Sequence, residues 1–365
     1  MQNVTLVLSG GGLKGLAHIG VFAALEERGL KPRLAVGTSM GSLVAAAWAS
    51  GMPVREMKAR ALEVRRRHVF QVAHVDMALR RLLSPAVYRR EPLDELITRL
   101  IGKRRFEDLH YPLLINTVDL HAGRQVFWGL PGRRDALVAD AVFASCALPG
   151  IFPPREIGGR LYVDGAVVEN LPVRIAETES TDPVIAVNLT ETSVRRSPHE
   201  TEGFAATYIR GLEIVMQSQI QGDLRGWGGP PLLLVEPRVA HVSMFSFTQT
   251  DELIREGRRA TLAALDSLSA PLHEMPRGLH PRRRVRLAVS AATCIGCGHC
   301  ARRAPGIFVM NGEKAEVVEP VQEWSPLDAR YVHECPTGAI SYEVLETDGK
   351  TPLRSPATRR SSGPS

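Results

Sequence analysis

The sequence predicts an α/β fold: a three-layer domain in which helices cover both faces of a mostly parallel central sheet, followed by a small α+β domain. From residue 4 to about residue 270, short apolar runs of strand length alternate with longer segments of helical spacing. A segment rich in proline and arginine then breaks this alternation. The chain of 365 residues is 44% hydrophobic and 23% charged, which suits a large buried core.

The first strand is expected at residues 4–9, because this almost wholly apolar run suits a strand that is buried on both faces. A helix of residues 16–28 should follow and stop at Gly29. The same two patterns recur along the large domain. They predict strands at residues 34–37, 112–119, 125–128, 161–163, 183–189 and 232–235. They predict helices at residues 41–50, 55–67, 91–101, 202–222 and 251–268.

Composition divides the chain into four parts. Residues 1–270 form the large domain, and residues 271–284, with three prolines and three consecutive arginines, form a linker. Residues 285–345 form the small domain, and the Ser-, Pro-, Gly- and Arg-rich residues 346–365 are expected to be a disordered tail. The small domain has a net charge of −2 and the whole chain +6, so the positive excess lies elsewhere. Such an excess can signal an anionic partner such as membrane phosphate or nucleic acid, but alone it decides little. We expect no nucleic-acid partner.

A nucleophile motif lies between the second predicted strand and the helix that follows it. Gly37-Thr38-Ser39-Met40-Gly41 has the form G-x-S-x-G, which gains its meaning from this strand–turn–helix context. Gly37 and Gly41 would let neighbouring backbone pass through a very sharp turn. Ser39 would be exposed at the tip of that turn, above the N-terminus of a helix. For this motif taken alone, a chance match in a glycine-rich turn is the alternative.

A glycine-rich loop at residues 10–15 also lies between a predicted strand and a predicted helix. Its glycines are Gly10, Gly11, Gly12 and Gly15. The loop matches G-x-G-x-x-G, but a dinucleotide site also needs an acidic residue about 20 positions further on. The second strand ends instead at residues 37–39, and no Gly-Lys-Ser or Gly-Lys-Thr of a P-loop is present. The glycine amides are therefore expected to form an oxyanion hole for a tetrahedral intermediate.

Asp164-Gly165 follows a short predicted strand, which delivers a carboxylate into a turn. Taken alone, Asp-Gly is a common turn dipeptide. The three motifs together resemble the patatin-like phospholipases: the glycine loop matches that family's oxyanion loop, G-x-S-x-G its nucleophile elbow and Asp164-Gly165 its catalytic pair. Residues 144–154 and 169–172 are similar to family segments on either side of the aspartate. The resemblance covers about residues 4–270 and departs at Ala166, where many members have a second glycine.

The resemblance implies a dyad of Ser39 and Asp164 that works without histidine. Asp164 must then take the proton of the serine hydroxyl as the attack proceeds. Because an unperturbed aspartate, with a pKa of about 3.9, is a weak base, we expect the site to be partly desolvated, which raises that pKa. The competing class, an α/β-hydrolase triad, would use His199 or His241, and neither sits in a recognisable strand-end motif. His18 is expected to be a packing or capping residue.

Four of the five cysteines cluster near the C-terminus, which in an intracellular chain favours metal ligation over disulfides. They are Cys294, Cys297, Cys300 and Cys335. Their C-x₂-C-x₂-C spacing, with a proline after the fourth, resembles the single-cluster bacterial ferredoxins, as do residues 304–308 and 335–340. The resemblance implies one 4Fe–4S cluster held by the four thiolates. Tetrahedral zinc is the alternative, although zinc sites usually pair two C-x₂-C knuckles.

The sequence thus predicts a carboxylic ester hydrolase of the patatin-like phospholipase type, which cleaves lipid or phospholipid acyl esters and carries a module for electron transfer or redox control. The alternative is a redox protein whose patatin-like domain is catalytically silent and only binds lipid. No apolar run of 18 residues and no leader peptide are seen, so we expect a cytoplasmic protein. Basic residues within 55–67 could hold it peripherally at a membrane, and an ordinary solvated helix is the alternative. Arg302 and Arg303 could pair with a redox partner or simply be exposed.

Overall fold

The computed structural model describes residues 2–72, 86–190, 202–244, 249–328 and 330–345. The chain forms two compact units, Met1–Gly278 and Leu279–Ser365. The tail of residues 346–365, expected to be disordered, lies outside the described residues. Among the described helices, none is both long and apolar enough to cross a membrane.

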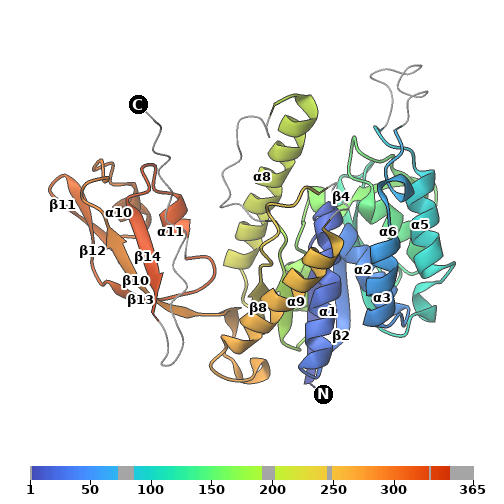
Figure 1. The fold of residues 1–365 in the computed structure, drawn as a ribbon, viewed down its shortest axis with the longest axis horizontal. Helices are drawn as coiled ribbons and strands as arrows, with labels where there is room; N and C mark the ends of the chain where they lie inside the picture. Colours follow the sequence, from blue (N-terminus) through green and yellow to red (C-terminus); the bar gives the residue numbers. More distant parts are fainter. Residues whose placement is uncertain (1, 73–85, 191–201, 245–248, 329, 346–365) are drawn as a thin grey trace. The chain divides into compact units, whose positions relative to one another are not determined.

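The larger unit alternates strands and helices along the chain, as the sequence predicts (Figure 1). Its strands are β1 (Gln2–Leu8), β2 (Leu30–Thr38), β3 (Leu113–Asp119), β4 (Arg124–Trp128), β5 (Arg155–Ile157), β6 (Arg160–Asp164), β7 (Val184–Val187), β8 (Pro231–Val235) and β9 (Gly278–His280). Its α-helices are α1 (Ala17–Glu27), α2 (Met40–Ala49), α3 (Val54–Glu63), α5 (Glu91–Ile101), α6 (Val138–Cys146), α7 (Val173–Glu179), α8 (Phe204–Arg225) and α9 (Thr250–Asp266). Short 3-10 helices are η1 (Gly12–Leu16), η2 (Arg66–His68), η4 (Phe106–Asp108), η5 (Gly165–Val167) and η7 (Leu272–Glu274).

These strands form one sheet with the order β5-β6-β3-β2-β1-β7-β8-β9, and β4 also pairs with β3. Neighbouring strands from β3 through β2, β1 and β7 to β8 are parallel, whereas β4, β5 and β6 run antiparallel. Every residue of β7 is buried. Because successive side chains of a strand point to opposite faces, both faces of the sheet are covered there. The predicted mostly parallel, covered sheet is confirmed.

Register brings the functional loops to one edge of the sheet. Leu8, the last residue of β1, pairs with Gly37 near the end of β2, so the chain leaves both strands side by side. Thr38 pairs with Asn116 of β3, and the next residue of β3 pairs with Asp164 at the end of β6. Three segments far apart in the sequence therefore meet at one place.

Helices α1 and α9 lie side by side and approach each other through glycine (Figure 1). A Cβ added at Gly257 of α9 would overlap the carbonyl oxygen of Ala17, and one added at Gly20 of α1 would overlap that of Ile254. The two helices are thus in backbone contact, which only a residue without a side chain permits.

The segment expected to be a linker is more regular than its composition suggests. Residues 271–284 contain η7 and β9, and the chain passes from one unit to the other within β9. Leu272, Leu279 and His280 are buried there, so apolar burial orders a stretch that its prolines and arginines mark as irregular. The sequence patterns also miss α6, α7 and the short strand β5.

The smaller unit is an α+β domain, as predicted. Strand β10 (Arg283–Val289) pairs in antiparallel fashion with β13 (Val321–Trp324) and β14 (Ile340–Val344). A hairpin joins β11 (Phe308–Asn311) to β12 (Lys314–Val317), and the helices are α10 (His299–Arg303) and α11 (Arg330–His333). Its own core contains Val285, Leu287, Phe308, Trp324 and Ile340.

The contact between α1 and α9 yields a test of the fold. Gly257→Ala should lower the free energy of unfolding by about 1–3 kcal/mol, because the new methyl group must push the two helices apart. Gly222→Ala in α8 is the matched control, since a Cβ there meets nothing within 4 Å. That variant should gain up to about 1 kcal/mol from helix propensity. Urea unfolding followed by circular dichroism measures both, and equal midpoints for the two variants would contradict the packing.

Candidate functional site

Ser39 stands at a strained turn between β2 and α2. Its φ of 53° and ψ of −128° make it the sole non-glycine residue with positive φ in the described part of the chain. A Cβ at Gly37 would lie 2.6 Å from the Cα of Ser42, and one at Gly41 would lie 2.6 Å from the carbonyl oxygen of Leu8. Both glycines are thus required by close backbone contact, which is the reason the sequence motif suggested.

Hydrogen bonds hold the strained serine from both sides. The Ser39 amide donates to Ser145 Oγ at 2.8 Å, and Ser145 Oγ in turn donates to the carbonyl oxygen of Asn116 at 2.7 Å. On the other side, Ser42 Oγ donates to the Ser39 carbonyl at 2.6 Å. The half-buried Ser39 therefore keeps its unusual backbone, and these bonds do not involve its hydroxyl.

Asp164 ends β6 beside this serine and is only 2% exposed. One carboxylate oxygen accepts from the Ala166 amide at 2.9 Å, and the carboxyl also interacts with the Ser39 hydroxyl by hydrogen bonding. Burial raises the pKa of Asp164 to about 7, against the smaller lowering effect of these two hydrogen bonds. The expected desolvated carboxyl next to Ser39 is what the structure contains.

Asn116 of β3 is a buried residue that sequence reasoning missed. Its side-chain amide donates to Thr38 Oγ1 at 3.1 Å and to the Glu169 carbonyl at 2.7 Å. A Cβ at Gly165 would overlap the Asn116 side chain, so the Asp-Gly pair has glycine because this amide passes so close. Asn116 therefore joins the serine turn to the aspartate turn. Nothing in the sequence around it signals this, because the contacts depend on sheet register.

The glycine loop differs from expectation at two of its four glycines. The Gly10 amide already donates to Asn170, at 3.0 Å to Oδ1 and 3.3 Å to the carbonyl oxygen. Gly15 lies inside η1, and a Cβ there would overlap the side chain of Met40, so this glycine serves packing. The amides of Gly11 and Gly12 have no protein partner within the described residues, and these two remain as candidate oxyanion donors.

Histidine takes no part in the contact between Ser39 and Asp164 as far as the described residues extend. His18 is fully buried, where its Nε2 donates to the Ser9 carbonyl at 2.9 Å, and desolvation lowers its pKa to about 4. It is thus a neutral residue that anchors the end of β1. His241 is exposed and bonds Glu252, and His199 lies outside the described residues.

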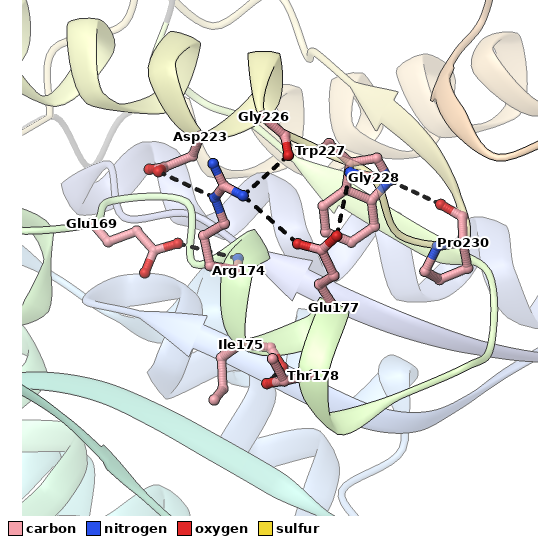
Figure 2. A network of polar contacts seen from close by, with 10 residues as sticks. All are labelled: Glu169, Arg174, Ile175, Glu177, Thr178, Asp223, Gly226, Trp227, Gly228 and Pro230. Carbon is pink, nitrogen blue, oxygen red and sulfur yellow. Dashed lines mark hydrogen bonds and ion pairs between the residues drawn. The ribbon is translucent and has the colours of Figure 1, made fainter.

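A second polar network fixes residues 169–170, the segment that bonds the Gly10 amide of the glycine loop (Figure 2). Glu169 is buried, which raises its pKa, and its carboxylate accepts from the Arg174 amide at 3.3 Å. The Arg174 guanidinium lies 3.6 Å from the Asp223 carboxylate and donates to the Gly226 carbonyl at 3.1 Å. These contacts tie α7 to the end of α8. They thereby steady Asn170, the residue after Glu169, which holds Gly10.

In the smaller unit, the four clustered cysteines line a single cavity. They are Cys294, Cys297, Cys300 and Cys335, and small or apolar side chains fill much of the remaining wall. None of the four forms a disulfide.

Cationic side chains and a backbone amide order the segments that carry the clustered cysteines. Lys314 Nζ donates to the Cys294 carbonyl at 2.6 Å, and the Arg302 guanidinium donates to the Cys297 carbonyl at 3.0 Å. The Ala339 amide points at the sulfur of Cys335 at 3.3 Å, as an amide does toward a thiolate.

The four cysteines line the cavity without meeting at one point. A structural zinc ion needs four ligands that converge within about 2.3 Å of one point. No three His, Cys, Asp or Glu side chains in the described ranges are grouped so as to hold one metal ion. A 4Fe–4S cluster takes one thiolate on each iron, so its cysteines ring a cavity instead of meeting at a point.

Two known families match the chain, one over each candidate site. Residues 6–177 match the family described as Patatin-like phospholipase. The chain carries a patatin-like phospholipase domain. Ser39, Asp164 and the glycine loop all fall inside the matched range. Residues 289–342, which contain the four clustered cysteines, match the 4Fe-4S single cluster domain of Ferredoxin I.

Relatives of the patatin-like domain occur in longer proteins. An uncharacterized NTE family protein of Mycobacterium tuberculosis is 27% identical over 288 residues, which cover 73% of this chain and 47% of the relative. Patatin-like phospholipase domain-containing protein 6 of Mus musculus is 30% identical over 199 residues, which cover 52% of this chain and 14% of the relative. The chain thus spans about half or less of these relatives. VipD from Legionella pneumophila, a solved structure, matches 73% of this chain and 67% of its own at 14% identity, with a TM-score of 0.40.

The raised pKa of Asp164 predicts a pH dependence of stability. The pKa of the Asp164 carboxyl is near 3.8 in the unfolded chain and about 7 in the folded patatin-like domain. Between these two pH values the folded state therefore binds one more proton than the unfolded chain. Stability should therefore fall as pH rises from about 4 to about 7, by on the order of 4 kcal/mol at most. Asp164→Asn should remove this component of the pH dependence. Urea unfolding of both proteins at a series of pH values measures it, and parallel curves would contradict the raised pKa.

Proposed function

We propose that the chain hydrolyses acyl esters of lipids, with Ser39 as the nucleophile and Asp164 as its base. The observation that carries this proposal is the buried Asp164 carboxyl, with a pKa of about 7, beside the hydroxyl of a serine at a strained turn. A general base works best when its pKa lies near the working pH. The phospholipase and esterase names of the relatives agree with lipid esters as substrates.

The first half of the reaction acylates the serine. Ser39 Oγ attacks the ester carbonyl carbon while Asp164 takes the hydroxyl proton. The carbonyl oxygen becomes an oxyanion, and the amides of Gly11 and Gly12 donate to it, aided by the N-terminal end of α2. The carbon–oxygen bond to the alcohol then breaks, and the alcohol leaves with the proton held by Asp164.

The second half returns the enzyme to its starting state. Water gives a proton to Asp164 and attacks the acyl-serine carbonyl carbon, so that the same two amides again receive the oxyanion. The bond to Ser39 Oγ breaks, the serine regains the proton from Asp164 and the fatty acid leaves. One carboxyl thus serves as base and acid in turn, for which a pKa near 7 is suited.

We further propose that Cys294, Cys297, Cys300 and Cys335 hold one 4Fe–4S cluster. The cluster would supply one-electron transfer, either to a redox partner protein or as a control on hydrolysis. The cavity lined by all four cysteines and the match to a single-cluster family support it. The amide that points at Cys335 and the cations that bond the loop carbonyls would favour the negatively charged thiolates.

A lipid substrate requires contact with a lipid surface, and the basic segment near α3 could make it. Two cations of α3 are already paired, Lys58 with Asp251 and Arg60 with Glu56. Arg55 and the run of residues 65–67 remain exposed. We propose that these arginines meet anionic headgroups of a cytoplasmic membrane surface, where each cation contributes about 1 kcal/mol.

The dyad is tested by removing each member. Ser39→Ala and Asp164→Asn should each lower kcat/KM for an acyl ester by about 1,000-fold or more, since the nucleophile or its base is lost. Assays at pH 8 keep Asp164 in its carboxylate form. A fluorophosphonate probe should label the wild type and leave Ser39→Ala unlabelled.

Ser269→Ala is the matched control, because Ser269 is exposed and far from the turn in sequence. It should retain labelling and activity. A folded wild type that takes no label in the presence of lipid would refute the hydrolase and favour a silent lipid-binding domain that serves a redox protein.

The cluster is tested by metal content. Anaerobically purified wild type should contain about four irons per chain and give a paramagnetic signal on reduction. Cys297→Ser should lose most of both. Cys146→Ser, a buried cysteine of the other unit, should keep them. Stoichiometric zinc without iron would contradict the assignment.

A further inference from the structure

A buried carboxylate that follows η5 accepts a hydrogen bond on each of its two oxygens. Glu169 is 6% exposed. One of its oxygens accepts from the Arg174 backbone amide at 3.3 Å, and the other accepts from the side-chain nitrogen of Gln125 in β4 at 2.8 Å. An ionised carboxylate has acceptors only, so each partner must present an N–H group to it. The Gln125 amide could otherwise lie either way round, and the carboxylate therefore fixes its orientation.

The orientation of Gln125 in turn determines that of Asn116 in β3. The same Gln125 nitrogen donates to Asn116 Oδ1 at 3.0 Å. Because the oxygen of Asn116 faces Gln125, its nitrogen faces the other way, toward Thr38 Oγ1 at 3.1 Å and the Glu169 carbonyl oxygen at 2.7 Å. Asn116 is fully buried, and both hydrogens of its amide are used. One carboxylate thus determines the orientation of two side-chain amides in succession.

The orientation of Asn116 matters because this amide lies between the two halves of the dyad. Thr38, whose hydroxyl it bonds, directly precedes Ser39. Gly165 directly follows Asp164, and a Cβ there would overlap the Asn116 side chain. If the amide turned over, its oxygen would face a backbone carbonyl oxygen, and two buried acceptors with no proton between them are unfavourable. The two turns would then shift, and a displacement of about 1 Å between reacting groups can lower a rate about 100-fold.

We infer that Glu169 is a positioning residue for the dyad, which acts through Gln125 and Asn116 to hold the aspartate turn against the serine turn. This role rests on the proposed hydrolase function and adds to it a side chain that bonds Gln125 and the Arg174 amide. Glu169→Gln isolates the role, because the new amide has one acceptor oxygen for these two donors. That oxygen can keep the Arg174 amide, so its nitrogen faces Gln125. The Gln125 amide must then turn over, and Asn116 with it.

The test measures kcat and KM for p-nitrophenyl butyrate, with the active sites counted by a fluorophosphonate probe so that unfolded chains do not contribute. Glu169→Gln should lower kcat by roughly 10- to 100-fold and leave KM within about twofold, since it displaces the dyad without touching the bound ester. Gln125→Leu, which removes the connecting amide, should have the same effect. The double variant should be no slower than the slower single variant, because the two residues act as one unit.

Glu177→Gln is the matched control, because it makes the same change in the neighbouring network (Figure 2). The Glu177 carboxylate accepts from the Gly228 amide at 3.2 Å and lies 3.7 Å from the Arg174 guanidinium. This variant should keep kcat within about twofold of wild type. If circular dichroism finds Glu169→Gln unfolded, Gln125→Leu alone should still show the loss of kcat.

Two results would overturn the inference while Ser39-dependent hydrolysis persists. One is a wild-type kcat in the folded Glu169→Gln and Gln125→Leu variants, which would leave Glu169 a purely structural residue. The other is a double variant whose loss is the product of the two single losses. Absence of Ser39-dependent hydrolysis by the wild type would instead refute the proposed function itself.

Discussion

The larger unit depends on one close approach of backbone at the carboxyl ends of β1 and β2. The chain must turn from β2 into α2 within a single residue, and α2 must start directly against the last residues of β1. Gly37 and Gly41 are the residues that make this approach sterically allowed. Its consequence is the left-handed conformation of Ser39, which turns the serine out of the strand and over the start of a helix.

The strain at Ser39 persists because buried polar groups determine the turn from several directions. Ser145 and Ser42 bond its amide and its carbonyl, and Asn116 connects Ser145 to the aspartate turn. Such groups must be paired, since an unsatisfied polar group in the interior costs about 1–3 kcal/mol. The same exclusion of water raises the pKa of Asp164. The fixed position of Ser39 and the raised pKa of Asp164 therefore have one cause, the buried interior behind the turn.

The sequence predicted the parts of this arrangement that depend on short-range geometry. A glycine on each side of Ser39 and a glycine after Asp164 mark close contacts, and the structure contains those contacts. Asn116 could not be predicted, because its role arises only when β3 pairs with β2 and β6 in a particular register. The hydrogen bond of the Gly10 amide could not be predicted for a related reason: the side chain that accepts it, that of Asn170, comes from a distant segment.

The surroundings of Asp164 also explain why Ser39, among the nearby hydroxyl and thiol groups, is the one suited to attack. Ser42 and Ser145 are fully buried, and the hydroxyl of each donates a hydrogen bond to a backbone carbonyl. Cys146 is close enough for the charge of Asp164 to act on it, yet burial first and that charge second raise the pKa of its thiol. A thiol that stays protonated is a poor nucleophile, because the thiolate is the reactive form. Only Ser39 combines partial exposure, contact with the base and nearness to unpaired backbone amides within the described residues. The Asp164 carboxyl beside Ser39 thus adds to burial in keeping the nearby Cys146 thiol protonated.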